Sequence, residues 1–417
     1  MHAAELDESC VQHTVEGTGM RKIAFVMPML LPMPPVRGGA VETLVNGLLL
    51  ENEKSGSIEF HVYCVYDKEA EKAAAKYKYT RFHMYRPNKK IMAAEHFAFR
   101  VFKKLFGMEP GEGREYIARV VRDLECEKWD AVIVENETFF SYITAKRLKN
   151  VPVYAHIHND IINGKKLYSA GAVKYCAGVL AISRYIKNRA MTARGASERK
   201  IQLLPNCIDT EKFRTEQYSK FRKDFREKHD IGEDDIVFMF AGRVIPEKGV
   251  LELAKAFAKL GMRNAWLMVV GSGWFSEDIR DEYLEAVKHE LESVKDRVIL
   301  TGYVPFDDMP EYYAVADAAV LPSVWEEPAS LTVIESLAAG LPLITTDAGG
   351  IAETADESCA FVLKRCAALS DNIAECMSRL ASDTELRRTM SAGAAERVSD
   401  RDYGAYYRKF VIAVTKA

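Results

Sequence analysis

Short apolar runs rich in β-branched residues alternate with amphipathic stretches from Arg21 onward. Apolar character is continuous within each run, which is typical of strands that are buried on both faces of a parallel sheet. The amphipathic stretches predict helices that cover those faces. The first series of predicted strands comprises residues 22–27, 60–66, 130–134, 151–157 and 177–182. The predicted helices between them include residues 40–53, 113–127 and 140–149.

A second, independent series follows a polar, charged stretch at about residues 209–233. Its predicted strands are residues 236–241, 265–270, 298–301, 317–321 and 341–345. Each series suffices for one doubly wound α/β domain of about 190 residues. We therefore expect an N-terminal tail at 1–19, a first domain at 20–208, a second domain at 209–400 and a helix at 401–417. Ligands of such sheets bind beyond the carboxyl ends of the strands, so we expect the active site where the two domains oppose each other.

The composition narrows the class of protein. Apolar residues make up 48% and charged residues 28% of the chain, which excludes a disordered chain, a collagen-like repeat and a small disulfide scaffold. A net charge of −3 argues against a dedicated nucleic-acid binder. The eight cysteines form no C-x-x-C pair, which favours reduced thiols in a cytoplasmic protein. No apolar run reaches the ~18 to 20 residues of a membrane span, and the acidic tail does not resemble a secretory signal.

The most informative motif lies within residues 322–353, where Glu327 is followed after seven residues by Glu335. A helix is predicted from Ser330 to Ala339 and ends at Gly340, which places Glu335 inside the helix and Glu327 in the loop before it. Free amides at a helix N-terminus can hold a diphosphate. Carboxylates on either side of that diphosphate can accept hydrogen bonds from sugar and ribose hydroxyls. The motif therefore indicates a nucleotide-sugar site.

This stretch resembles the signature of the family-4 retaining glycosyltransferases of the GT-B fold, and the resemblance extends over most of residues 21–416. Further segments match in type and order, namely 203–213, 241–250, 269–274, 301–323 and 348–350. The resemblance implies two Rossmann-like parallel-sheet domains that face each other across a cleft, with the C-terminal helix crossing back to the first domain. It also implies transfer from a nucleotide-diphosphate sugar, by default a UDP-hexose or UDP-N-acetylhexosamine, to a glycan or lipid-linked acceptor in surface polysaccharide or glycoconjugate synthesis.

The resemblance assigns roles to individual residues. Arg243 and Lys248 match the basic pair that binds the donor diphosphate, and fixed cations stabilise the negative charge that grows on that group. The catalytic set that it implies is His158, Glu327, Arg243 and Lys248. The donor-binding set comprises Gly38, Gly39, Arg243, Lys248, Gly271, Tyr303, Val304, Glu327, Ala329, Ser330, Leu331 and Glu335. The family commonly has an aromatic residue at position 329 and glycine at 330, so the sequence leaves the shape of the sugar pocket open.

His156 and His158 lie two residues apart on a predicted strand and therefore share one of its faces. That spacing suits a metal pair, but no further Cys/His cluster in the sequence supports one. The resemblance implies that His158 is the active-site histidine, which touches the donor sugar near the reacting carbon. If the register slips by two, His156 takes that place.

The sequence gives no sign of a cofactor or a metal. No G-x-G-x-x-G follows the first strand or residues 236–241, which disfavours a nicotinamide dehydrogenase. The D-x-D at Asp400–Asp402 precedes the last predicted helix and is interpreted as its N-cap. Cations and helix ends therefore take the place of a metal. The alternatives are an epimerase or phosphorylase of the same architecture, and a coat or assembly protein that has lost turnover.

One further segment, residues 76–106, contains nine lysines and arginines and a single acidic residue, Glu95. Phe99, Phe102 and Phe106 recur there at helical spacing, with basic residues between them. Two interpretations remain open. The segment is either a helix that lies on an anionic membrane, which would place the protein at the inner face of the cell membrane, or a helix with its Phe stripe in the core. No nucleic-acid partner is expected.

Overall fold

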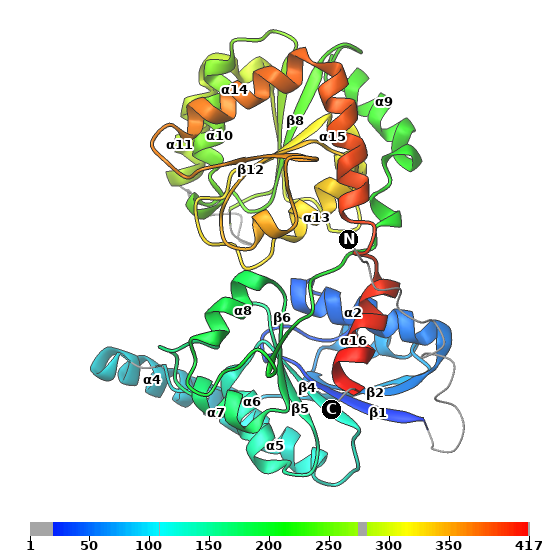
Figure 1. The fold of residues 1–417 in the computed structure, drawn as a ribbon, viewed down its shortest axis with the longest axis vertical. Helices are drawn as coiled ribbons and strands as arrows, with labels where there is room; N and C mark the ends of the chain where they lie inside the picture. Colours follow the sequence, from blue (N-terminus) through cyan, green and yellow to red (C-terminus); the bar gives the residue numbers. More distant parts are fainter. Residues whose placement is uncertain (1–19, 108, 274–281, 416–417) are drawn as a thin grey trace.

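The computed structural model describes residues 20–107, 109–273 and 282–415, which form two α/β domains stacked along the long axis of the molecule (Figure 1). The first domain holds a seven-stranded sheet in the order β3-β2-β1-β4-β5-β6-β7, and every neighbouring pair is parallel. Its strands are β1 (Arg21–Val26), β2 (Ile58–Val65), β3 (Thr80–Tyr85), β4 (Ala131–Glu135), β5 (Val153–Ile157), β6 (Gly178–Ala181) and β7 (Ile201–Leu203).

Helices cover both faces of this sheet, as its continuous apolar strands predict. One core packs against α5 through Ile117 and Val120, and a separate core packs against α2 through Leu44 and Leu48. The helices are α2 (Ala40–Ser55), α3 (Lys68–Ala74), α4 (Lys89–Phe106), α5 (Arg114–Leu124), α6 (Thr138–Arg147), α7 (Ser169–Tyr175) and α8 (Arg184–Met191).

The second domain holds a six-stranded parallel sheet in the order β10-β9-β8-β11-β12-β13. Its strands are β8 (Ile236–Ala241), β9 (Ala265–Val270), β10 (Val298–Gly302), β11 (Ala318–Leu321), β12 (Leu343–Thr346) and β13 (Ala360–Leu363). Its α-helices are α9 (Ser219–Lys228), α10 (Val250–Leu260), α11 (Glu282–Leu291), α12 (Met309–Val315), α13 (Leu331–Ala338), α14 (Leu369–Ser382) and α15 (Thr384–Arg397). Short 3₁₀ turns are η1 (Glu211–Phe213), η2 (Thr215–Tyr218), η3 (Pro246–Lys248), η4 (Glu292–Arg297) and η5 (Ile351–Glu353).

The predicted fold class, two doubly wound parallel-sheet domains, is confirmed. The polar stretch at 209–233 contains a helix, α9, which docks on the second domain through charge. Arg222 and Arg226 both reach Asp317, at 2.6 Å and 3.4 Å, and Asp317 also accepts the backbone N–H of Val237 at 2.7 Å. Phe221 and Phe225 of α9 also pack against the core of this domain, so both ionic and apolar contacts fix the helix.

The last helix, α16 (Tyr403–Thr415), lies beside α2 of the first domain (Figure 1). Phe410 is buried there and stacks on Phe25 of β1 with ring centroids 5.7 Å apart. The side chain of Asp402 accepts the backbone N–H of Ala405 at 2.9 Å, so the D-x-D does form the N-cap that the sequence predicts. The chain therefore returns to the first domain after completing the second.

The carboxyl ends of the two sheets face each other. Ser183, which follows β6, donates its hydroxyl hydrogen to the carbonyl of Pro328, which follows β11, at 2.6 Å. Strand order reverses between β1 and β4 in the first sheet and between β8 and β11 in the second, and such switch points are where open α/β sheets bind ligands. Within the described residues, no helix combines the length and the apolar character that crossing a bilayer requires.

Candidate active site

An ion pair lies at the switch point of the second sheet. Lys248 ends η3 after β8, and its ammonium group contacts Oε1 of Glu327, in the loop after β11, at 2.6 Å. The hydroxyl of Ser323 donates to the same oxygen at 2.8 Å. Glu327 is buried, whereas the side chain of Lys248 is 25% exposed. The loop can approach β11 this closely because Gly249 has a φ of +69° and lacks a Cβ, which would lie 2.0 Å from the carbonyl oxygen of Pro322.

A small pocket adjoins this pair, and Ser330 and Thr332 contribute to its lining together with Phe240, Ala241, Leu321 and Ile351. Arg243, on the same loop as Lys248, is exposed. The loop thus presents two cations, the exposed Arg243 and Lys248, and Lys248 is paired with a carboxylate. Cations at the carboxyl end of a sheet suit an anionic ligand such as a diphosphate.

The other predicted donor-binding residues of the second domain follow neighbouring strands. Gly271 follows β9 and has a φ of +137°, and a Cβ there would lie 1.9 Å from the carbonyl oxygen of Gly242. Tyr303 and Val304 follow β10. The Tyr303 side chain is exposed, whereas Val304 packs against the domain core. All three therefore lie at the same end of the sheet as the Lys248–Glu327 pair.

Helix α13 begins directly after the Glu327 loop, close to the predicted position. Ser330 precedes its first turn, and the Ser330 hydroxyl pairs with the Thr332 hydroxyl at 2.9 Å instead of capping the backbone. Ala329 packs against the core of the first domain, and Leu331 packs against that of the second. The N-terminal amides of α13 can therefore serve an anionic ligand at the domain boundary.

Glu335 lies in α13, as predicted, but its surroundings differ from those of Glu327. It is 5% exposed, and its Oε2 accepts the hydroxyl hydrogen of Tyr313 from α12 at 2.9 Å. Burial raises the pKa of Glu335 to about 7, and the hydrogen bond from Tyr313 opposes this shift only in part. The hydrogen bonds thus join Glu327 to Lys248 and Glu335 to Tyr313, in two separate contacts.

In the first domain, Gly38 and Gly39 lie between β1 and α2 with φ angles of +76° and +107°. A Cβ on Gly39 would lie 2.2 Å from the carboxylate of Glu42, so this loop has no room for a side chain at that position. Glu42 is 4% exposed. Its pKa is raised chiefly by burial, and further by the charge of Glu135. The glycine loop therefore lies next to buried carboxyl groups.

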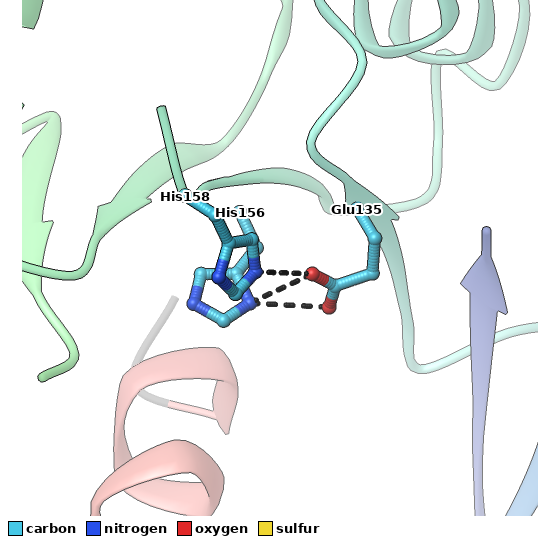
Figure 2. Close-up of side chains that lie close together, drawn as sticks. All are labelled: Glu135, His156 and His158. Carbon is cyan, nitrogen blue, oxygen red and sulfur yellow. Dashed lines mark hydrogen bonds and ion pairs between the residues drawn. The ribbon is translucent and has the colours of Figure 1, made fainter. Parts of the chain in front are cut away.

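His158 belongs to a buried cluster with Glu135 and His156 (Figure 2). The Nε2 atom of His158 lies 2.9 Å from Oε2 of Glu135. The Nδ1 atom of His156 lies 3.1 Å from Oε1 and 3.0 Å from Oε2 of the same carboxylate. His156 is 1% exposed and its Nε2 has no hydrogen-bond partner among the described residues, whereas His158 is 8% exposed.

Glu135 and His158 differ in their protonation and charge. Burial raises the pKa of Glu135, but the charge and hydrogen bond of His156, followed by those of His158, outweigh burial and hold it at about 2. Burial is also the main cause that lowers the pKa of His158, and the neighbouring His156 lowers it further. Glu135 is therefore a carboxylate at neutral pH, and His158 is a neutral imidazole that it can orient.

Glu135 is the residue of this site that the sequence analysis missed. It ends β4, which pairs in parallel with β5, and the register places it directly beside His156. A polar residue at the end of an otherwise apolar strand was the available signal. Glu135, His156 and His158 each offer one possible ligand atom, and these atoms lie within 4.8 Å of one another. The residue types therefore suit a metal site as well as a hydrogen-bonded cluster.

Two protein families match the chain, one in each domain. The family described as Glycosyl transferases group 1 matches residues 221–397. The family described as Glycosyltransferase Family 4 matches residues 57–212. Between them the two matches include every site residue discussed above except Gly38, Gly39 and Glu42.

Two curated relatives match along most of their length. A putative glycosyltransferase, YtcC of Bacillus subtilis, is 26% identical over 385 residues, which is 90% of this chain and 87% of that protein. The lipopolysaccharide 1,2-N-acetylglucosaminetransferase of Salmonella typhimurium is 26% identical over 344 residues, which is 80% of this chain and 82% of that protein.

Among solved structures, the Anabaena protein Alr3699/HepE in complex with UDP superposes with a TM-score of 0.73 over 95% of this chain and 100% of that one, at 16% identity. The same Anabaena protein in complex with UDP-glucose gives a TM-score of 0.70 at 16% identity, over 95% of this chain and 100% of that one. At this level of identity, the likeness concerns the fold.

Proposed function

The chain belongs to the group 1, family 4-like glycosyltransferases of the GT-B fold, and from this premise we propose that it is a retaining glycosyltransferase that uses a UDP-hexose or UDP-N-acetylhexosamine. The observation that carries the proposal is the Lys248–Glu327 pair at the switch point of the second sheet, on the side that faces the first domain. The relative that transfers N-acetylglucosamine and the neighbour that binds UDP-glucose support this class of donor.

Arg243 and Lys248 hold the donor diphosphate. As the bond between the sugar and the phosphate breaks, negative charge grows on the nucleotide, and two fixed cations stabilise it more in the transition state than in the ground state. The ammonium group of Lys248 already contacts Glu327, so it can bridge this carboxylate and an incoming phosphate. The N-terminal amides of α13 add partial positive charge without a metal.

Glu327 and His158 face the transferred sugar from the two domains. Glu327 accepts hydrogen bonds from sugar hydroxyls and stabilises the positive charge that develops on the ring as the bond breaks. The acceptor hydroxyl attacks from the face that the phosphate leaves, and the leaving phosphate oxygen takes the proton of that hydroxyl. The new bond therefore has the anomeric configuration of the donor.

The acceptor is a glycan or a lipid-linked intermediate of surface polysaccharide or glycoconjugate synthesis, in keeping with the lipopolysaccharide enzyme among the relatives. We place the protein in the cytoplasm and at the surface of a membrane through α4. Much of the apolar surface of this helix is exposed, which favours the membrane interpretation of residues 76–106 over a core-facing stripe. Its exposed apolar residues are Ile91, Met92, Phe97, Val101, Phe102, Leu105 and Phe106.

Product analysis tests the function directly. The purified protein is incubated with UDP-glucose, UDP-galactose or UDP-N-acetylglucosamine, with and without a lipid-linked saccharide acceptor, in excess EDTA. We expect acceptor-dependent release of UDP, a product with the donor's anomeric configuration by NMR, and no loss of rate in EDTA. Conversion of the donor without acceptor would instead indicate an epimerase, and phosphate-dependent cleavage of a glycosidic bond would indicate a phosphorylase. Loss of activity in EDTA that a divalent metal restores would contradict the metal-free mechanism.

A matched pair of variants links the activity to the site. Arg243→Ala is expected to lower turnover by roughly 10²-fold, the scale of one lost transition-state contact. Arg263→Ala, which removes an arginine beyond the amino end of β9, is expected to leave turnover unchanged. Equal rates for the two variants would contradict the assignment of the diphosphate site.

A further inference from the structure

Two consecutive residues at the end of β4 hold His158, one through its side chain and the other through its backbone. The carboxylate of Glu135 accepts the Nε2–H of the imidazole at 2.9 Å. The side-chain oxygen of Asn136 accepts the backbone N–H of His158 at 3.0 Å. Glu135 ends β4 and Asn136 follows it, whereas His158 follows the neighbouring β5, so the side chain and the main chain of His158 are fixed from the same turn.

The backbone of Asn136 is unusual. Its φ is +48°, a left-handed conformation that residues other than glycine seldom adopt, although asparagine tolerates it better than most. The Asn136 N–H donates to the carbonyl of His156 at 2.7 Å, which continues the ladder that pairs Glu135 with His156. A strained residue that is held by its neighbours points to a functional site, and here the strain directs the Asn136 side chain at His158.

We propose that the Glu135–Asn136 turn positions His158 for the donor sugar and sets the tautomer of its imidazole. The proposal rests on the proposed function only in naming the sugar as the ligand. Glu135 and Asn136 are positioning residues, since they contact His158 and reach the substrate through it. A carboxylate can only accept hydrogen bonds, so it selects the imidazole that carries hydrogen on Nε2.

This tautomer determines what His158 can offer the sugar. A neutral imidazole with hydrogen on Nε2 carries a lone pair on Nδ1, so His158 acts as a hydrogen-bond acceptor for a sugar hydroxyl. His158 keeps 8% of its surface exposed, against 1% for His156, so of the two imidazoles it is the one that a ligand can reach. Glu135 and His156 support it from the buried side.

The chemistry of the cluster requires a carboxylate at position 135. Glu135 accepts hydrogens from two imidazoles, His156 through Nδ1 and His158 through Nε2. A glutamine at this position offers one acceptor oxygen and one donor NH₂ group, so it cannot accept from both. In Glu135→Gln one imidazole must therefore change its tautomer or lose its bond, although the shape of the side chain is kept.

The same three residues could instead bind a metal ion, and this reading makes a different prediction. A metal ligated by His158 Nε2 would replace the hydrogen that Glu135 accepts. The direct contacts of 2.9–3.1 Å between the carboxylate and both imidazoles have the lengths of hydrogen bonds, which favours positioning by hydrogen bonds over ligation.

The first test is spectroscopic and does not depend on activity. Protein labelled with ¹⁵N in its histidine rings is compared by NMR as wild type and as Glu135→Gln, with His158→Gln for assignment. We expect a single Nε2–H tautomer for His158 in the wild type and a mixture or the opposite tautomer in Glu135→Gln. An identical His158 spectrum in the two proteins would overturn the proposal. So would metal binding, seen as one mole of Zn²⁺ retained per mole of wild type, but not of Glu135→Gln, after dialysis against Zn²⁺.

The second test uses Asn136 and stays informative if Glu135→Gln does not fold. Asn136→Gly keeps the left-handed backbone accessible and removes the oxygen that holds the His158 N–H, whereas Asn136→Asp keeps that oxygen. We expect Asn136→Gly to lower kcat by on the order of 10²-fold, as a misplaced catalytic group does, with KM for the donor changed less than threefold. Asn136→Asp should restore most of the rate.

The two tests separate failure of this proposal from failure of the proposed function. Equal kcat values for Asn136→Gly and Asn136→Asp, or a change in KM alone, would overturn the positioning role even in an active transferase. If no nucleotide sugar is turned over by the wild type, the proposed function fails, and the tautomer measured by NMR still decides whether Glu135 sets the state of His158.

Discussion

The ion pair between Lys248 and Glu327 determines what a substitution at either residue does to the protein. The carboxylate is buried, and its partners are an ammonium group and a hydroxyl. Removing the ammonium group would leave a buried carboxylate uncompensated, so variants of this pair are expected to lower stability as well as activity. Glu335, by contrast, is held by the neutral Tyr313. The two glutamates of the motif therefore have different roles.

We predict that Glu327→Gln lowers kcat while the affinity for free UDP stays nearly unchanged, because Glu327 acts on the sugar as its ring gains positive charge. Glu335→Gln should weaken the binding of both donor and free UDP, because ribose hydroxyls are present in substrate and product alike. Calorimetry with UDP beside initial rates measures both effects. Tyr313→Phe, which removes only the hydrogen bond to Glu335, is the control for a disturbed helix.

The opposite pattern, with UDP affinity lost in Glu327→Gln and kept in Glu335→Gln, would mean that the donor lies in the reverse direction. A loss of UDP affinity in Tyr313→Phe equal to that in Glu335→Gln would assign the effect to the packing of α12 on α13.

The pKa of Glu335 also predicts a pH dependence of stability. Burial raises this pKa from 4.5 to about 7 in the folded protein. Between these values the folded state keeps a proton that the unfolded state releases, so the stabilisation is complete below pH 4.5 and is lost as pH rises through 7. A shift of this size corresponds to about 3 kcal/mol. Denaturant unfolding at pH 5 and pH 8 should therefore show that Glu335→Gln gains stability relative to wild type at the higher pH. If the difference in free energy of unfolding between the two proteins is the same at both pH values, the raised pKa of Glu335 is contradicted.

At the residue scale, the sequence predicted the positions that a linear motif can mark. Glu335 was correctly predicted inside a helix and Glu327 in the loop before it, and α13 begins one residue after the predicted start, because helix periodicity is a local property. The contact of Lys248 with Glu327 joins residues 79 apart in the chain, and that of Glu135 with His158 joins residues 23 apart. Such contacts depend on which strands are neighbours, and a single sequence does not show that.

Among the elements, α4 differs from the rest because its apolar residues remain exposed. Phe97 is 71% exposed, Leu105 is 68% exposed and Phe106 is 58% exposed. At ~100° per residue, these side chains lie on one half of the helix, and Arg100, Lys103 and Lys104 lie on the other. Glu95 attaches the helix to the domain by accepting the backbone N–H of Gly113, ahead of α5, at 2.7 Å. Figure 1 shows α4 at the outer edge of the first domain.

We predict that α4 binds vesicles containing anionic lipid and releases them at high salt. Lys103→Gln with Lys104→Gln should weaken binding roughly 30-fold, since each basic residue contributes about 1 kcal/mol near such a surface. Leu105→Ser with Phe106→Ser should weaken it further, without affecting UDP binding. The control is Lys295→Gln with Lys364→Gln on the second domain. Sedimentation with vesicles measures the binding of all three double variants. Vesicle binding that is insensitive to salt, or that the control substitutions weaken equally, would contradict the prediction.

The strands show where element prediction succeeds. The bounds of β8 and β9 were predicted to the residue. Each is a run of six apolar residues, the pattern expected of a strand whose sheet is covered on both faces. β3, β7 and β13 were not predicted. They lie at or next to the edges of their sheets, where fewer neighbours bury them, and β3 carries Arg81 and His83 within the basic segment.

In the whole molecule, polar contacts across the domain interface and the return of α16 to the first domain hold the two domains together. The carboxylate of Glu353, in η5 of the second domain, accepts the backbone N–H groups of Arg184 and Tyr185 at 2.6 Å and 2.7 Å. These amides form the N-terminus of α8 in the first domain, so Glu353 completes a helix cap across the interface. The sheets are thereby held with their carboxyl ends opposed.

We predict that Glu353→Ala shifts the protein toward a more open arrangement. Loss of a cap costs about 1 kcal/mol, which raises the open population roughly fivefold. Small-angle scattering should show a larger radius of gyration for Glu353→Ala than for Glu357→Ala, a variant of an exposed glutamate four residues further on. Identical scattering by the two variants would show that α16 and the remaining contacts suffice to hold the domains.

Donor binding at the Lys248–Glu327 pair is the central claim, and a thermal-shift screen of nucleotide-diphosphate sugars on wild type and Lys248→Ala tests it most directly. A ligand at 100 times its Kd stabilises the native state by about 2.7 kcal/mol, which corresponds to a rise in Tm of several degrees for a domain of this size. We predict such a rise for wild type with a UDP-hexose or UDP-N-acetylhexosamine, in the presence of EDTA, and little or none for Lys248→Ala. An equal rise in both proteins, or no rise with any nucleotide sugar, would contradict the account.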